Sequence, residues 1–158
     1  LRPDVLFFGA RMNDGGGERL FVSPKSPPAK QIIGCMDGND AHDLIDRLEI
    51  TWLQFGDGTS EAIHQRITER VDLIIQIRRM RDGSRKITGI WEVDGVIEGR
   101  AAVYPMFRFE HIGTESGKVI GRMVQVTSTS RFTSRFAVHG FDPAVLNFDP
   151  FDASSSKR

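Results

Sequence analysis

The chain has 158 residues, 39% of them hydrophobic and 27% charged, which is ordinary for a soluble globular protein of one domain. Its 21 Lys and Arg residues balance its 21 Asp and Glu residues, so no net charge draws it toward nucleic acid or a membrane surface. Cys35 is the only cysteine, which excludes an internal disulfide and favours a reducing cytoplasm, and no apolar run approaches the roughly 20 residues that span a bilayer.

The first predicted element is a strand. Val5–Phe8 is a continuous apolar run closed by a glycine, which is typical of a strand buried on both faces. It begins almost directly after Leu1, and this abrupt start suggests that the chain is part of something longer. Glycines and prolines predict a loop over Met12–Lys30, and a second buried strand is predicted at Gln31–Met36.

Two helices are predicted next. Asp40 can cap the first helix, which should end near Gly56–Gly58, and Thr59 or Ser60 opens the second. Apolar residues recur at helical spacing in both segments. They are Ala41, Leu44, Ile45, Leu48 and Trp52 in the first and Ile63, Ile67 and Val71 in the second.

After Asp72 the hydrophobic pattern becomes that of strands. Leu73–Ile77 is predicted as a strand, and Asp82 and Gly83 carry the signal of a two-residue hairpin turn with Gly83 at positive φ. We expect one face of the return strand to carry Ile87, Gly89, Trp91 and Val93.

The rest of the chain is predicted to continue as an antiparallel meander with a closing helix. The expected turns and strands are, in chain order, Asp94-Gly95, Ala101–Tyr104, Ser116-Gly117 and Val119–Val126. Ser130 is expected to cap a helix that carries Phe132 and Phe136 and ends at Gly140. The serine-rich tail Asp152–Arg158 is expected to be loose.

Several segments follow the motifs of a known family in order. They are LRPDVLFFG at Leu1–Gly9, DGND at Asp37–Asp40 with RLE at Arg47–Glu49, VDLIIQ at Val71–Gln76 and RDGSRKIT at Arg81–Thr88. In them the chain resembles the C-terminal half of type II/IV secretion ATPases of the Tad-pilus and conjugation kind. The family's Walker B region, histidine box and later β segments typically read R-P-D then G-E, H-A-N-T then R-L-E, V-D-L-I-V-Q, and R-D-G-S-R-R-V-T. The resemblance covers nearly the whole chain.

The resemblance implies an α/β fold, the C-terminal part of a RecA-like P-loop ATPase domain with an antiparallel β extension. The RecA-like segment would be residues 1–71, the extension with its closing helix 72–151, and the loose tail 152–158. The positions that match the family's nucleotide site are Asp4, Gly9, Ala10, Asp37, Asn39, Arg47 and Glu49. Arg66 and Arg70, one helical turn apart, are candidates to contact the nucleotide of a neighbouring subunit.

The departures from the family pattern argue against hydrolysis by this chain. The sequence holds no phosphate loop of the form G-x-x-x-x-G-K-[ST], which the family carries well upstream of Walker B. Ala10 stands in place of the Walker B glutamate and can neither orient water nor accept a proton. Asp37 stands in place of the box histidine and would repel a γ-phosphate. We therefore expect no catalytic residue and no cofactor here, with ATP and Mg implied only for an intact family member.

Three functions remain open at this point. The leading one is a degenerate or truncated segment of a secretion or pilus-assembly ATPase that contacts copies of itself or other ATPase subunits in the cytoplasm. The second is a fragment of an active ATPase whose P-loop lies upstream, and the third is a free-standing adaptor or nucleic-acid-binding module. A solvated strand face explains the basic stretch Arg78–Lys86 better than nucleic acid does, and no zinc or calcium spacing predicts a metal site.

Self-association is predicted from the first strand. If Val5–Phe8 lies in a parallel sheet without the strand that leads into a P-loop, its open edge offers unpaired backbone groups to another chain. We therefore expect a dimer or larger assembly with Val5–Phe8 at or near the contact.

Overall fold

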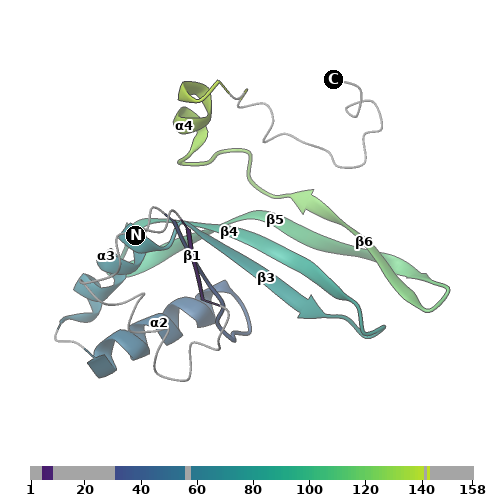
Figure 1. Cartoon of the computed structure of the whole chain (residues 1–158), viewed down its shortest axis with the longest axis horizontal. Coiled ribbons are helices and arrows are strands. Elements are labelled where there is room, and N and C mark those ends of the chain that lie inside the picture. Colours follow the sequence, from purple (N-terminus) through teal and green to yellow (C-terminus); the bar gives the residue numbers. More distant parts are fainter. Residues whose placement is uncertain (1–4, 9–30, 56–57, 141, 143–158) are drawn as a thin grey trace. The chain divides into compact units, whose positions relative to one another are not determined.

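The computed structural model describes residues 5–8, 31–55, 58–140 and 142, and the chain is mixed α/β (Figure 1). The elements are β1 (Val5–Phe8), β2 (Gln31–Gly34), α2 (Ala41–Phe55), α3 (Ser60–Arg70), β3 (Leu73–Arg79), β4 (Arg85–Ile97), β5 (Arg100–Glu115), β6 (Lys118–Gln125) and α4 (Thr133–Val138). None of these helices is long and apolar enough to cross a membrane. The expectations for Asp4, Gly9, Ala10 and the tail after Asp152 lie outside the described residues.

The chain divides into two compact units. One contains β1, β2, α2 and α3 together with Gly95–Ala101, the tip of the hairpin between β4 and β5. The other contains the remainder of that hairpin with β3, β6 and α4. The hairpin tip thus belongs with the helices, although the strands that carry it belong to the sheet.

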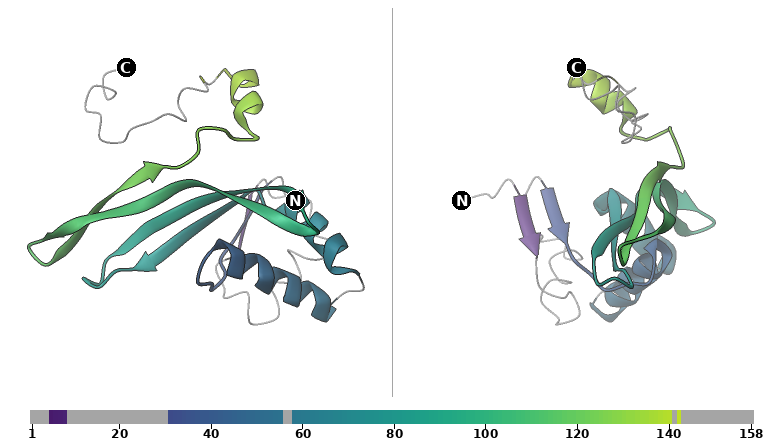
Figure 2. Two further views of the ribbon diagram at one scale, coloured as in Figure 1. Left: turned by 180° about the vertical axis from the view of Figure 1, so that it is seen from behind. Right: turned by 90° about the vertical axis from the view of Figure 1, so that its right-hand side faces the viewer.

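In the first unit, β1 and β2 pair in parallel, with Val5 opposite Gln31 and Phe8 opposite Gly34 (Figure 2). The second strand ends at Gly34, so its predicted extension to Met36 is wrong. The prediction that this strand is buried is also wrong, because Ile33 is 51% exposed. This sheet has two strands among the described residues.

The two predicted helices are confirmed, and each begins at its expected capping residue. Asp40 Oδ1 accepts hydrogen bonds from the backbone N–H groups of His42 and Asp43, both at 2.9 Å. Thr59 Oγ1 accepts one from the N–H of Ala62 at 3.3 Å. The predicted apolar stripes form the core, in which the buried side chains are Ala41, Ile45, Leu48, Trp52, Ile63 and Ile67.

The second unit contains a four-stranded antiparallel sheet in the order β3-β4-β5-β6, which confirms the predicted antiparallel extension. The predicted turn between β5 and β6 is also confirmed. Ser116 and Gly117 have φ values of 48° and 76° and join the paired residues Glu115 and Lys118. Two successive residues at positive φ are the signature of a type I′ hairpin turn.

The turn between β4 and β5 lies later than predicted. Asp94-Gly95 was expected to end the strand, but Gly95 lies inside β4 with φ of 72°. The chain instead turns at Glu98 and Gly99, whose φ values are 50° and 78°. A glycine in the left-handed region lets a strand bend without ending, so the Asp-Gly signal marks an irregularity here and not a turn.

The hairpin between β3 and β4 has a three-residue loop, so the prediction of a two-residue turn is wrong. The positive φ predicted for Gly83 is confirmed at 80°. Its N–H donates to the carbonyl of Met80 at 3.0 Å, and the N–H of Met80 donates to the carbonyl of Ser84 at 2.7 Å. Asp82 has no positive φ, which a type I′ turn would require. A β-turn followed by a left-handed glycine is the usual three-residue loop.

A β-bulge changes which side chains of β4 share a face. Gln76 pairs with Gly89, but the next residue, Ile77, pairs with Ile87, so Thr88 is the extra residue. Directly paired residues point to the same face of a sheet, so Ile77 and Ile87 lie on one face and Gln76 and Gly89 on the other. The prediction that Ile87 shares a face with Gly89 is therefore wrong.

Two glycines of this sheet lie under aromatic rings. A Cβ atom on Gly89 would lie 2.1 Å from the Trp91 ring, and one on Gly121 would lie 2.3 Å from the Phe109 ring. An aromatic ring over a strand glycine covers the backbone that the missing side chain leaves open. Both positions therefore require glycine for close packing.

The closing helix α4 has six residues and ends as predicted, before Gly140, whose φ is 77°. Its N-cap residue is Phe132, without a side-chain cap. The hydroxyl of Ser130 accepts a hydrogen bond from the N–H of Phe132 at 3.1 Å, so this serine orders the approach to the helix and does not cap it as expected.

Candidate functional site

Two of the predicted nucleotide-site residues, Asp37 and Asn39, follow the carboxyl end of a parallel strand. Phe8 at the end of β1 lies opposite Gly34 at the end of β2, so both strands end at the same edge of their sheet. In open α/β sheets, ligands bind outside this edge. Asp37 and Asn39 follow β2 there, whereas Asp4, Gly9 and Ala10 lie outside the described residues.

Asn39 and Arg47 are brought together by a third residue, Asp43. The backbone N–H of Asn39 donates to Asp43 Oδ2 at 2.7 Å, and Arg47 Nε donates to the same oxygen at 3.1 Å. The hydrogen bond from Asn39 is the main cause that lowers the pKa of Asp43, and Arg47 adds to it. This arrangement fixes the start of α2 and places the guanidinium of Arg47 against a carboxylate.

Glu49 is half-buried and contacts the buried side chain of His64. Glu49 Oε2 is 3.2 Å from His64 Nε2, and the hydroxyl of Ser60 donates to the other carboxylate oxygen. The hydrogen bond from Ser60 is the main cause that lowers the pKa of Glu49, with a further contribution from His64. Glu49 therefore joins α2 to α3.

The hydrogen bonds of His64 determine which nitrogen carries its proton. His64 is 1% exposed, and its Nδ1 accepts a hydrogen bond from the backbone N–H of Ala101 at 3.2 Å. An acceptor nitrogen has no proton in neutral imidazole, so Nε2 is protonated and donates to Glu49. Beside this bond, Arg100 forms an ion pair with Asp46 of α2. The imidazole thus anchors the tip Gly95–Ala101 to both helices.

The cluster does not form a nucleophilic triad. In a triad the hydroxyl donates to the imidazole, but Ser60 donates to the carboxylate of Glu49. Both nitrogens of His64 are also engaged within the protein. His64 therefore has a structural role in this unit.

The two arginines expected to contact a neighbour lie on α3. The guanidinium carbon of Arg66 is 5.9 Å from the centre of the Trp52 ring, within the range of a cation–π contact. Arg70 is exposed at the end of the helix. Their contact with another subunit's nucleotide stays a prediction.

Arg131 forms a cluster that sequence reasoning missed. Its guanidinium pairs with Asp72, lies 3.6 Å from Asp94, and lies 3.9 Å from Glu92, which is 3% exposed. Its backbone N–H also donates to Glu92 at 2.7 Å. One cation thus ties the segment before α4 to the beginning of β3 and to β4. The partners are distant in sequence, so a local pattern gives no signal for them.

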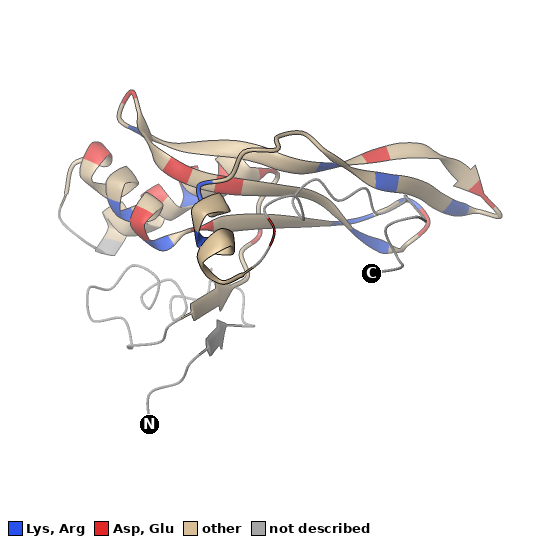
Figure 3. Ribbon diagram, turned by 90° about the horizontal axis from the view of Figure 1, so that it is seen from above, with Lys and Arg blue, Asp and Glu red and all other residues tan. Residues whose placement is uncertain are grey.

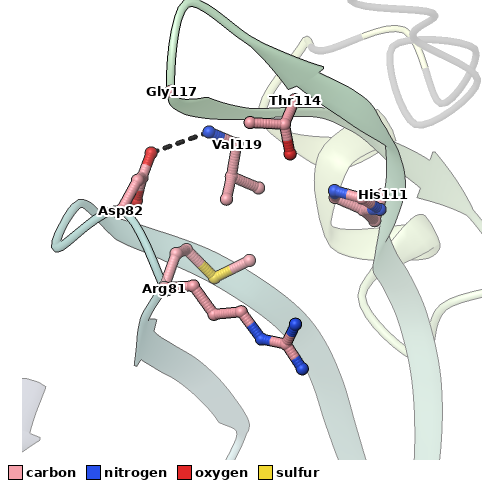
Figure 4. A pocket seen from close by; sticks show the side chains of 7 residues that line it. Arg81, Asp82, His111, Thr114, Gly117 and Val119 are labelled. Atoms are coloured by element: carbon pink, nitrogen blue, oxygen red, sulfur yellow. Dashed lines mark hydrogen bonds between the residues drawn. The ribbon is translucent and has the colours of Figure 1, made fainter.

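A cavity of about 530 Å³ lies between the two hairpin ends of the sheet (Figure 4). Asp82 Oδ2 accepts a hydrogen bond from the N–H of Val119 at 2.7 Å, which joins the β3–β4 loop to β6. Asp82 Oδ1 accepts from the N–H and hydroxyl of Ser84, and these bonds lower the pKa of Asp82 to about 2, Ser84 first and Val119 next. The residues that line the cavity are Met80, Arg81, Asp82, His111, Thr114, Gly117 and Val119.

No metal site is present in the part of the chain that the structure describes, where no three His, Cys, Asp or Glu side chains are placed to share an ion. Acidic and basic residues are interspersed along the strands (Figure 3).

No protein-family model matches the chain, and no curated protein matches it either. The function is therefore argued from the residues and their geometry.

Proposed function

We propose that the chain is a degenerate or truncated segment of a secretion or pilus-assembly ATPase, which does not hydrolyse ATP by itself and acts through subunit contacts in the cytoplasm. In this proposal, β1, β2, α2 and α3 belong to the C-terminal part of a RecA-like domain. The partners are copies of this chain or other secretion ATPase subunits.

The observation that carries the proposal is the common edge at which β1 and β2 end, with Phe8 opposite Gly34. In the proposed family this edge holds the Walker B glutamate after the first strand and the box histidine after the second. In the sequence, Ala10 and Asp37 occupy those two positions, and Asp37 is exposed. Alanine has no group that can accept a proton from water, and a carboxylate in place of the histidine puts negative charge where the γ-phosphate would lie.

The antiparallel sheet gives independent support. The motifs VDLIIQ and RDGSRKIT, in which the resemblance is strongest, coincide with β3 and with the loop and start of β4. These two elements form one hairpin, so the matching residues lie together in space. A hairpin of this kind presents a surface and not a reactive group, which fits a role in subunit contact.

The test is ATP turnover and ATP binding by the purified chain. We expect no phosphate release above buffer in the presence of ATP and Mg, and no rise in melting temperature. A ligand at 100 times its dissociation constant would stabilise the protein by about 2.7 kcal/mol, which a melting curve resolves.

The double variant Ala10→Glu with Asp37→His is the matched control. It restores the two family residues at the edge but supplies none of the phosphate-holding groups of a P-loop, so it should stay inactive as well. Turnover by a contaminant-free sample of the unaltered chain would refute the proposal. Turnover by the double variant alone would show that the edge still binds nucleotide and would favour the active-fragment alternative.

A further inference from the structure

The outer strand β3 has an unusually apolar open edge. In the described part of the chain β3 pairs with β4 alone. Its residues Leu73, Ile75 and Ile77 are 50%, 54% and 62% exposed, and Ile87, which pairs with Ile77, is 44% exposed. Large apolar side chains that gather at a strand edge mark a site for pairing with another chain.

The backbone groups of β3 that do not bond to β4 belong to the same residues as its exposed apolar side chains. The carbonyl of Asp72 accepts from the N–H of Val93, and the N–H of Met80 donates to the carbonyl of Ser84. Residues of an antiparallel strand alternate between facing the partner strand and facing away. Even-numbered residues from Asp72 to Met80 therefore face β4, and the bulge does not disturb this order because its extra residue lies on β4. The residues that face outward are Leu73, Ile75, Ile77 and Arg79.

The usual protections of an edge strand are absent from β3. It has no proline and no lysine, and its three outward-facing apolar residues alternate with residues that bond to β4. Arginine occurs only at its end, at Arg78 and Arg79. The middle of the strand is thus open to pairing, since edge strands are normally blocked there by a charge, a bulge or a proline.

We propose that β3 pairs antiparallel with β3 of a second copy of this chain, about a two-fold axis at Gln76. In this register Ile75 lies opposite Ile77 of the partner subunit, and Leu73 lies opposite Arg79 of the partner subunit. Every outward-facing residue then forms a hydrogen-bonded pair, and the isoleucines of both copies meet at the centre. The contact is the same patch on both copies, as a closed dimer requires.

Charge selects this orientation over a parallel one. The strand follows an acidic residue, Asp72, which pairs with Arg131 but stays 64% exposed, and it ends in Arg78 and Arg79. Antiparallel pairing places the arginines of one copy beside the acidic start of the other, whereas parallel pairing would place arginine against arginine. Like charges directly opposite each other destabilise a sheet.

The inference rests on the proposed function in that it names a surface for the subunit contact, although the argument uses β3 alone. It differs from the contact expected at Val5–Phe8. ATP turnover would refute the proposed function and leave the pairing of β3 untouched, so the two can fail separately.

The first experiment is sedimentation equilibrium of the whole chain across a wide range of concentration. We expect a monomer–dimer equilibrium whose dissociation constant rises at least about tenfold in Ile77→Lys, because the substitution removes an apolar contact and places a charge in the interface. Ile112→Lys is the matched control, since Ile112 is 63% exposed and lies on β5, away from this edge. Its dissociation constant should equal that of the unaltered chain. A monomer at every concentration, or a dimer that Ile77→Lys leaves unchanged, would overturn the proposal.

The second experiment tests the proposed register between the β3 strands of the two copies. In a Cys35→Ser background, Gln76→Cys places two thiols across the proposed axis, in a pair whose separation suits a disulfide. We expect mild oxidation to give a covalent dimer at concentrations where the unaltered chain is dimeric. Thr114→Cys, an exposed position on β5, should stay monomeric in a denaturing gel. Cross-linking of both variants to the same extent would contradict the register.

Discussion

Replacement of His64 by leucine tests the buried cluster that joins α2, α3 and the hairpin tip. His64→Leu keeps an apolar side chain in the core but removes an acceptor from the N–H of Ala101 and a donor from Glu49. An unsatisfied buried polar group costs about 1–3 kcal/mol. Glu49 keeps its hydrogen bond from Ser60 and is partly exposed, so the cost of losing its bond to His64 lies at the low end of that range. We expect a total loss of about 2–4 kcal/mol of unfolding free energy.

Urea unfolding followed by far-ultraviolet circular dichroism measures this loss. A typical domain is stable by about 5–15 kcal/mol, so the expected shift of the midpoint is large. Glu49→Gln should cost less than His64→Leu, because the amide oxygen of Gln can still accept from Nε2. His42→Leu is the matched control, since His42 is exposed on α2 and the same change there should stay within about 0.5 kcal/mol. If His64→Leu were as stable as His42→Leu, the hydrogen bonds of the imidazole would not stabilise the fold and the reasoning would be wrong.

Three further predictions concern the antiparallel sheet. The folded-state pKa of Asp82 is lowered from 3.8 to about 2, so its stabilising contribution is complete above about pH 4 and is lost as the pH falls toward 2; melting curves of Asp82→Asn should lack this part of the acid dependence, and curves parallel to those of the unaltered chain would contradict it. Gly83→Val should cost on the order of 1–2 kcal/mol, because Gly83 has φ of 80°; an unchanged urea midpoint would refute the strain argument. Gly89→Ala should cost about 1–3 kcal/mol, since the new Cβ would lie 2.1 Å from the Trp91 ring, whereas Gly113→Ala meets nothing within 4 Å and is the matched control for melting experiments.

The helices and the strand pattern could be predicted because their signals are local. The side chain of Asp40 bonds to N–H groups two and three residues later, so its role is visible in a short window of sequence. The same holds for the helical spacing of Ile63 and Ile67, which both become fully buried. Gly83 was placed correctly at positive φ because few other residues tolerate that conformation.

The misplaced turn at Asp94-Gly95 shows where local signals fail. Asp-Gly is a stronger turn signal than Glu-Gly, yet the chain turns at Glu98-Gly99. Either glycine can adopt positive φ, so the choice depends on how far β4 and β5 remain paired. Pairing is a property of the sheet and not of four consecutive residues. For the same reason the bulge at Thr88, which moves Ile87 to the other face, had no signal in the alternation of β4.

The candidate site was only partly predictable. The predicted residues fall into two groups according to what each one contacts. Asn39 and Arg47 meet at Asp43, at the start of α2, but Glu49 bonds to His64 in the helical core. The proposed function assigns these three residues to a nucleotide site, yet each already has a bond inside its own unit. Their presence therefore needs no bound nucleotide to explain it. Under the proposed function, hydrolysis would depend on the positions of Ala10 and Asp37, which carry neither the glutamate nor the histidine of the proposed family. Asn39, Arg47 and Glu49 therefore stabilise the α2–α3 unit through these bonds, whether or not the chain hydrolyses ATP.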